Sequence, residues 1–221
     1  MPASHSVISY DNTAVIPVPK DKPGWMARHE AINAEVSKGN VDLIYIGDSI
    51  VEHFNSKGKD AWDRYYAPRH AVNMGISGDR TQHVLWRLDH GELTGLDPKW
   101  VVINIGSNNT SDHNSAAEIM DGIKAVCERV RTQLPHAGII LMSVFPRDEK
   151  ADSPRRKMIA EINRMIADYA KANGIVNLDI VEKFLDPNGS VRKDLLPDRC
   201  HPVEPGYRIW AEALLPYLDS K

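Results

Sequence analysis

Strand-like and helix-like segments alternate along almost the whole chain, and this alternation restricts the fold more than any other feature. Five apolar runs have the length of buried strands and end near glycine, proline or small polar residues: 41–46, 71–74, 100–105, 139–145 and 175–180. Helical patterns separate these runs. Such an order requires right-handed crossovers and a parallel sheet with helices on both faces. We therefore predict an α/β fold, a single three-layer α/β/α domain with a five-stranded parallel sheet.

Two helical segments carry clear start or stop signals. Residues 115–134 begin with a capping box of Ser115 and Glu118 and then bring apolar residues to one face. Residues 153–173 are followed by Gly174, a common helix terminator. Further helices are expected at 25–37, after Ser49, after Asp79 and at 205–218.

Length and charge limit the classes of protein to which the chain can belong. Its 221 residues suit one domain with a substantial core, and no linker divides them. We expect an N-terminal extension over residues 1–22 and a catalytic domain over residues 23–221. The net charge of −3 provides no basic field to hold a phosphate backbone, so nucleic acid is not an expected partner.

Membrane spans and metal or disulfide frameworks are not expected either. No apolar run approaches the roughly 20 residues that cross a bilayer, and Cys127 and Cys200 are too far apart for a zinc knuckle. Motifs typical of metal, nucleotide or dinucleotide binding are absent, so no cofactor is inferred. As given, the chain is expected to be soluble and cytoplasmic, or secreted or periplasmic if an export signal was trimmed from it.

Three loops that follow predicted strands carry residues suited to acyl transfer. Parallel strands place these loops at one edge of the sheet, where open α/β sheets bind ligands. Ser49 begins a helix whose N–H groups favour negative charge beside the hydroxyl. Gly75 leaves its backbone N–H open to a ligand, and Asn108 offers an amide donor to an oxyanion. Taken singly, the three residues are equally typical of a helix cap and of turns.

A fourth loop, before the last helix, places Asp198 three residues ahead of His201. The carboxylate can accept a hydrogen bond from one ring N–H and leave the other ring nitrogen free to take a proton. Alone, this pair is also compatible with a purely structural hydrogen bond. Together with Ser49 and two oxyanion donors on the same edge, it favours catalysis.

These residues resemble the SGNH (GDSL-type) hydrolase superfamily. Its blocks match, in order, Gly47-Asp48-Ser49, Gly75, Gly106-Ser107-Asn108-Asn109 and Asp198-Arg199-Cys200-His201. The resemblance covers about residues 41–210. Residues 73–93 look like the branch that contains the catalytic subunits of platelet-activating-factor acetylhydrolase and bacterial short-chain esterases. Ile50 replaces the leucine of the family's name, and Asn109 stands where many members have aspartate.

The resemblance implies a flavodoxin-like fold and assigns a role to each matched residue. Ser49 is implied as the nucleophile, His201 as the base and Asp198 as the residue that orients the base. The implied oxyanion hole consists of the Ser49 and Gly75 backbone N–H groups and the Asn108 amide. Neither a metal nor a cofactor is implied.

Other residues in the sequence are alternatives for the same roles. His53 lies four residues after Ser49 and is an alternative base, although we expect it to approach from the helix side. Cys200 is an alternative nucleophile, for which a lining role is favoured because no helix terminus serves it. His83 and Trp86 suit either a substrate pocket or core packing.

We therefore expect a serine esterase that hydrolyses short-chain esters, acetyl above all, of carbohydrates or other small alcohols through an acyl-enzyme. The short-chain preference comes from the resembled branch and from the lack of a long apolar lid insertion. A platelet-activating-factor-like phospholipid acetylhydrolase is the alternative substrate class. A catalytically silent sugar-binding module is an alternative from another class. A subunit that acts mainly by association is a third, because the resembled acetylhydrolase subunits form homodimers.

Overall fold

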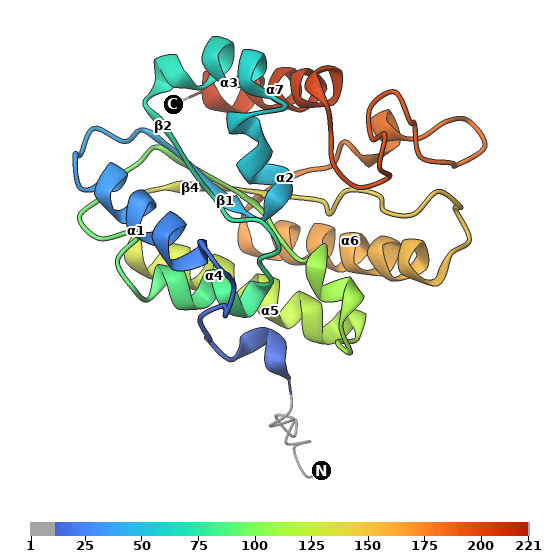
Figure 1. Ribbon diagram of the computed structural model, residues 1–221, viewed down its shortest axis with the longest axis horizontal. Coiled ribbons are helices and arrows are strands. Elements are labelled where there is room, and N and C mark those ends of the chain that lie inside the picture. Colours follow the sequence, from blue (N-terminus) through green and yellow to red (C-terminus); the bar gives the residue numbers. More distant parts are fainter. Residues whose placement is uncertain (1–11, 221) are drawn as a thin grey trace.

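Five parallel strands form the centre of the computed structural model, which describes residues 12–220 (Figure 1). The strand order is β2-β1-β3-β4-β5. The bounds are β1 (Leu43–Gly47), β2 (Ala71–Gly75), β3 (Trp100–Asn104), β4 (Gly138–Met142) and β5 (Val176–Leu178). Every pairing between neighbours is parallel, so the predicted sheet is confirmed.

Helices cover both faces of the sheet because its side chains alternate between two apolar clusters. One face, with Ile44 and Ile46, packs against α1 (Trp25–Val36), α4 (Thr81–Leu88), α5 (Ala116–Gln133) and α6 (Pro154–Asn173). The other face, with Leu43 and Tyr45, packs against α2 (Ser49–Glu52), α3 (Lys59–Tyr65) and α7 (Glu204–Leu218). The three-layer α/β/α architecture is thus also confirmed (Figure 1).

The helix caps expected from the sequence are present in the structure. Ser115 Oγ accepts a hydrogen bond from Glu118 N, and the Glu118 carboxylate accepts one from Ser115 N, which completes the capping box of α5. Gly174 ends α6 with φ of 63°, a left-handed conformation that glycine adopts without strain.

Helix α3 was not expected from the sequence. Its stretch is rich in aromatic residues rather than in aliphatic residues at helical spacing, and it is stabilised by tertiary packing. Trp62 and the following Tyr66 lie 5.4 Å apart between ring centroids, and each packs against the ring of Tyr45 in β1. The contacts with Tyr45, which anchor this segment to the sheet, are therefore distant in sequence.

Residues 12–22, the described part of the expected N-terminal extension, lie against the domain; residues 1–11 lie outside the described residues. Ala14 is fully buried in a short 3₁₀ helix, Thr13–Val15. Its carbonyl accepts a 2.7 Å hydrogen bond from Thr81 Oγ1 of α4. Lys20 Nζ donates to the carbonyl of Gly78, in the loop after β2. The segment thus reaches from α4 to the edge of the sheet where the strands end.

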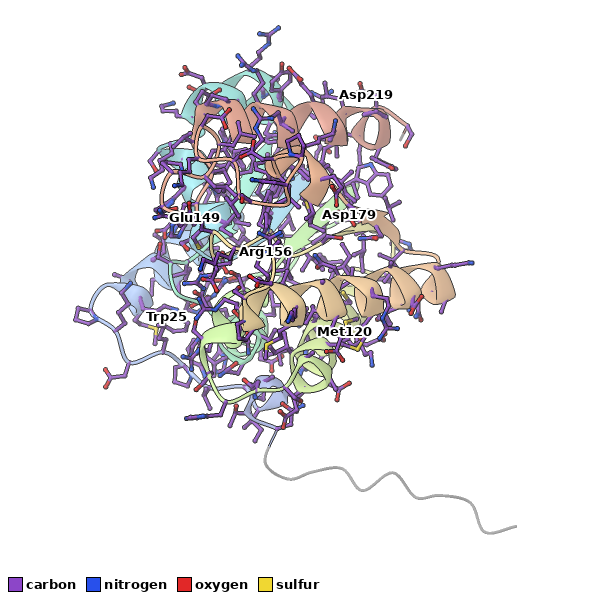
Figure 2. All side chains as sticks on the ribbon, turned by 90° about the vertical axis from the view of Figure 1, so that its right-hand side faces the viewer. Trp25, Met120, Glu149, Arg156, Asp179 and Asp219 are labelled. Carbon is purple, nitrogen blue, oxygen red and sulfur yellow. The ribbon has the colours of Figure 1, made fainter. Side chains whose placement is uncertain are left out.

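The loops that follow the strands all lie at one end of the molecule. Figure 1 shows the long loops after β4 and before α7 on its right-hand side, and Figure 2 looks onto that side, with Glu149 and Arg156 labelled. None of the helices formed by residues 12–220 is long and apolar enough to cross a membrane.

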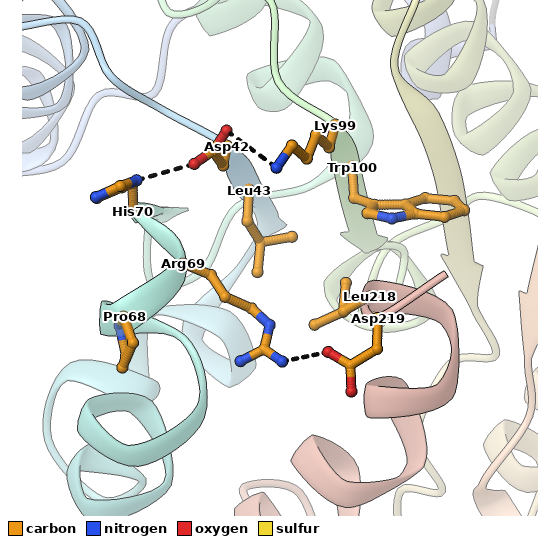
Figure 3. Close-up of a pocket in the computed structure, with 9 residues that line it drawn as sticks. All are labelled: Asp42, Leu43, Pro68, Arg69, His70, Lys99, Trp100, Leu218 and Asp219. Atoms are coloured by element: carbon orange, nitrogen blue, oxygen red, sulfur yellow. Dashed lines mark hydrogen bonds and ion pairs between the residues drawn. The ribbon is translucent and has the colours of Figure 1, made fainter. Parts of the chain in front are cut away.

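A cavity of about 390 Å³ lies at the opposite edge of the sheet (Figure 3). Its lining includes Leu43 and Trp100, the first residues of β1 and β3. The charged groups at its mouth are paired with one another: Arg69 with Asp219, and His70 with Asp42. This cavity is therefore separated by the length of the strands from the loops that carry the predicted site.

Candidate active site

Three predicted site residues form one hydrogen-bonded row at the carboxyl edge of the sheet. Ser49 Oγ lies 2.9 Å from His201 Nε2, and Nδ1 of the same ring lies 2.7 Å from Asp198 Oδ2. Ser49 is the first residue of α2, directly after β1, whereas Asp198 and His201 lie in the loop before α7. The fold therefore joins residues that are 152 positions apart.

Asp198 is held in its ionised form by the backbone around it. Its Oδ1 accepts hydrogen bonds from the backbone N–H groups of His201 at 2.7 Å and Cys200 at 3.0 Å. Partial burial acts to raise the pKa of Asp198, but these bonds and the His201 ring outweigh burial and lower the pKa to about 2. An anionic Asp198 favours the tautomer that carries its proton on Nδ1, and in that tautomer Nε2 can accept a hydrogen bond from the Ser49 hydroxyl.

Asn108 connects the loops that follow β1 and β2. It begins a 3₁₀ helix, Asn108–Ser111, and its Nδ2 donates to Asp48 Oδ2 at 3.1 Å and to the Asp79 carbonyl at 2.9 Å. Both hydrogen bonds join the Asn108 amide to residues far away in sequence, and one of them, Asp48, directly precedes Ser49. The side chain therefore links separate loops and does not stabilise a local turn.

Gly75, the last residue of β2, allows helix α2 to approach the sheet closely. A Cβ at this position would lie 2.2 Å from the backbone nitrogen of Glu52, so only glycine fits. The Gly75 N–H donates to the side-chain oxygen of Asn73 at 2.9 Å. A ligand that uses this N–H must share it with Asn73 or displace that side chain.

Asp48, which precedes Ser49 in the matched motif, has a structural role that the sequence does not reveal. It is 1% exposed, and its Oδ1 accepts a 2.9 Å bond from Ile50 N, which caps α2, while Oδ2 holds Asn108. Burial raises the pKa of Asp48 to about 7 against the opposing effect of the Ile50 hydrogen bond. A carboxyl group that titrates near neutrality thus stands directly beside Ser49.

Asn109, which stands where many members of the family have aspartate, is itself hydrogen-bonded within the fold. The side chain is fully buried, and its Oδ1 accepts from Thr81 N at 3.1 Å, at the start of α4. Its Nδ2 donates to Thr81 Oγ1 and Gln82 Oε1, each at 3.2 Å. Asn109 therefore fastens the loop after β3 to α4.

The alternative candidates occupy different positions. The His53 ring packs against the His201 ring with centroids 5.0 Å apart, while Ser49 Oγ is hydrogen-bonded to His201 Nε2. Cys200 Sγ lies 3.9 Å from His201 Nε2, and burial raises the pKa of its thiol to about 11, which disfavours the thiolate. His83 and Trp86 both pack against Trp25 of α1.

No three His, Cys, Asp or Glu side chains within residues 12–220 gather in a way that would hold a metal ion. The geometry instead provides a hydroxyl, an imidazole and a carboxylate in line, together with fixed amide groups close by. Such a set can transfer a proton from a hydroxyl and bind developing negative charge.

Relatives of known sequence share most of the chain. It is 34% identical over 184 residues to the platelet-activating factor acetylhydrolase IB subunit alpha2 of Rattus norvegicus, covering 83% of this chain and 78% of that protein. It is 32% identical over 212 residues to the alpha1 subunit of the same species, covering 92% and 88%.

Solved structures share the fold. A GDSL-like lipase from Bacteroides thetaiotaomicron aligns with a TM-score of 0.74 at 22% identity, covering 87% of this chain and 96% of that one. An acetylxylan esterase from Geobacillus stearothermophilus aligns with a TM-score of 0.64 at 22% identity, covering 82% and 95%. The sequence profile of one family matches residues 45–209. The chain therefore belongs to the GDSL-like lipase/acylhydrolase family.

Proposed function

We propose that this protein is a serine esterase that removes a short acyl group, acetyl above all, from a carbohydrate or another small alcohol. The observation that carries the proposal is the row from Ser49 through His201 to Asp198, with contacts of 2.9 and 2.7 Å. Membership of an acylhydrolase family agrees with that chemistry.

In the proposed mechanism, Ser49 Oγ attacks the ester carbonyl while His201 Nε2 takes the hydroxyl proton. Asp198 keeps the ring in the required tautomer and stabilises the imidazolium that forms. The imidazolium then gives its proton to the departing alcohol oxygen. Water attacks the acyl-enzyme in the second half, with His201 again as base, and the acid is released.

The oxyanion of each tetrahedral intermediate is proposed to bind the Ser49 N–H, the Gly75 N–H and the Asn108 amide. The first N–H groups of a helix have no partner within the helix, and Ser49 begins α2. The Asn108 Nδ2 carries two hydrogens, and in this structure both donate, to Asp48 Oδ2 and to the Asp79 carbonyl. An oxyanion that binds this amide must therefore share or replace one of these acceptors, while the remaining hydrogen bond keeps the amide in position.

The acyl and alcohol groups are inferred from relatives. Acetyl is the acyl group in the names of both the platelet-activating factor acetylhydrolase subunits and the acetylxylan esterase. The second name supports a carbohydrate alcohol. A phospholipid acetylhydrolase is the second candidate, favoured by the 34% identity over 83% of the chain. Intact hydrogen bonding of Ser49 to His201 argues against a silent binding module.

Ser49→Ala tests the proposal, with Ser77→Ala as the matched control. Ser77 lies on the loop after β2, and its hydroxyl donates to the Glu52 carboxylate instead of to an imidazole. Acetate release from acetylated sugars, aryl acetates and an acetylated phospholipid should vanish in Ser49→Ala and persist in Ser77→Ala. An organophosphonate should label Ser49. Labelling of Ser77 or Cys200, or full activity in Ser49→Ala, would refute the mechanism.

A further inference from the structure

Arg147 is a cation of the candidate site without a carboxylate partner. It follows β4, at the edge where the strands end, and it is half-buried. Its Nη1 donates to the Ser107 carbonyl at 3.3 Å, and Ser107 directly precedes Asn108. Among residues 12–220, no Asp or Glu oxygen lies within 4.0 Å of its guanidinium. The Arg147 side chain is therefore bonded to the loop that carries Asn108, but no carboxylate of the described residues pairs with its positive charge.

Two neighbouring arginines on the same edge, Arg155 and Arg199, are in ion pairs. Arg155 Nη1 lies 2.7 Å from Asp148 Oδ1, and Arg199 Nη2 lies 2.9 Å from Glu149 Oε2. Both charges are therefore compensated within the protein. Arg147 differs from them in having donor positions and a positive charge that remain available to a ligand.

The charge of Arg147 acts on both sides of the Ser49–His201 contact. Asp48 directly precedes Ser49, and Cys200 directly precedes His201. Burial raises the pKa of both Asp48 and Cys200, and the positive charge of Arg147 acts to lower both pKa values. Asp48 itself is bonded to Ile50 and Asn108 and not to Arg147. A substrate bound over the serine would therefore meet this charge.

We propose that Arg147 binds an anionic group, a carboxylate or a phosphate, on the alcohol portion of the ester and so selects acetate esters of acidic alcohols. The inference rests on the proposed esterase function. An acetyl group is too small to carry the charge, which places the anion on the leaving alcohol. A guanidinium suits this role because its planar set of N–H donors matches the oxygens of either anion.

The test compares three esters with similar leaving alcohols: propyl acetate, 4-acetoxybutanoate and 3-acetoxypropyl phosphate. The wild-type protein should show a higher kcat/KM for at least one anionic ester than for propyl acetate, and added salt should reduce the difference. The two anionic esters distinguish a carboxylate from a phosphate. An acetylated ether phospholipid adds a phosphate within a lipid headgroup.

Arg147→Gln should lower the ratio of anionic to neutral kcat/KM by about tenfold to a hundredfold, mainly through KM, because one charged hydrogen-bonding partner is lost. Arg147→Lys should retain part of the ratio. Arg155→Gln is the matched control, since it removes an equal charge close to Cys200 that is already paired. It should leave the ratio unchanged.

An unchanged ratio in Arg147→Gln, or an equal fall in Arg155→Gln, overturns the inference. A fall in Lys20→Gln instead would place the anion site on the opposite side, near Gly78. If a substitution impairs folding, the wild-type protein alone can test the inference. Butyl phosphate or butanoate should then inhibit its hydrolysis of propyl acetate competitively, and butanol should not. If the wild-type protein hydrolyses none of the esters, the proposed function itself fails. If it hydrolyses all three without preference, only the role of Arg147 fails.

Discussion

Asn108→Ala separates a catalytic amide from a structural one. The substitution removes two hydrogen bonds, to Asp48 Oδ2 at 3.1 Å and to the Asp79 carbonyl at 2.9 Å. One acceptor belongs to a buried carboxyl group, so we expect a loss of about 2–4 kcal/mol in the free energy of unfolding. For a domain of this size the melting temperature should fall by roughly 5–15 °C. Stability alone therefore says nothing about catalysis.

The neighbouring Asn109 provides a matched control. Its side chain makes three hydrogen bonds of 3.1–3.2 Å, all directed to Thr81 and Gln82 in α4. Asn109→Ala should therefore cost a similar free energy of unfolding, about 2–4 kcal/mol. Because Asn109 faces α4, it has no proposed contact with the oxyanion. Any difference in rate between the two variants then reports on the position of Asn108.

Thermal unfolding gives the melting temperature of each variant, and acetate release is then measured on both variants below those temperatures. If Asn108 donates to the oxyanion, kcat should fall by about 10²–10³ in Asn108→Ala with little change in KM. Asn109→Ala should show no selective loss of kcat. Equal losses of kcat in the two variants would refute the oxyanion role and reduce Asn108 to a link between loops.

Four further substitutions have expected outcomes. His201→Ala should remove nearly all ester hydrolysis, and Asp198→Asn should lower kcat by up to about 10⁴ by favouring the wrong tautomer; steady-state kinetics check both, and retained activity in either contradicts the proposed row. Arg87→Met should cost about 3–5 kcal/mol in urea unfolding, because it leaves the fully buried carboxylates of Asp79 and Glu92 without their cation. Asp48→Asn should gain stability relative to the wild type as pH rises from about 4 to 7, since the folded carboxyl has a raised pKa and its ionisation is disfavoured. A stability difference that does not vary with pH would contradict that environment for Asp48.

The fold could be predicted because its signals are local. Each strand is a short apolar run, and the main helices carry their own caps, so the expected and observed bounds differ by a few residues. The run at 139–145 illustrates the error, since β4 ends at Met142 although Val144 and Phe145 stay buried. Apolar and buried residues thus continue beyond the end of the strand, so an apolar run alone does not show where the strand ends. Helix α3 is not predicted from the sequence because aromatic contacts with Tyr45, distant in sequence, stabilise this segment.

The proximity of Ser49, Asp198 and His201 could also be expected, because parallel topology brings the loops after the strands to one edge. The partners of Asn108 could not. They depend on how the loops after β1, β2 and β3 pack in three dimensions, and Asp79 lies 29 residues away in sequence. Likewise, nothing in the sequence around Arg147 shows that it lacks a carboxylate partner while Arg155 has one.

The buried carboxyl group of Asp48 is unfavourable for stability, but it has a positional role that an apolar side chain could not fill. A carboxyl group that is 1% exposed disfavours its own ionisation, as its pKa of about 7 indicates, and an apolar residue would be easier to bury. Only an acceptor with two oxygens, however, can cap α2 through Ile50 N and hold the Asn108 amide at once. The same side chain thus fixes the helix that presents Ser49 and the amide proposed to bind the oxyanion, so the unfavourable burial is concentrated where the relative position of two loops matters most.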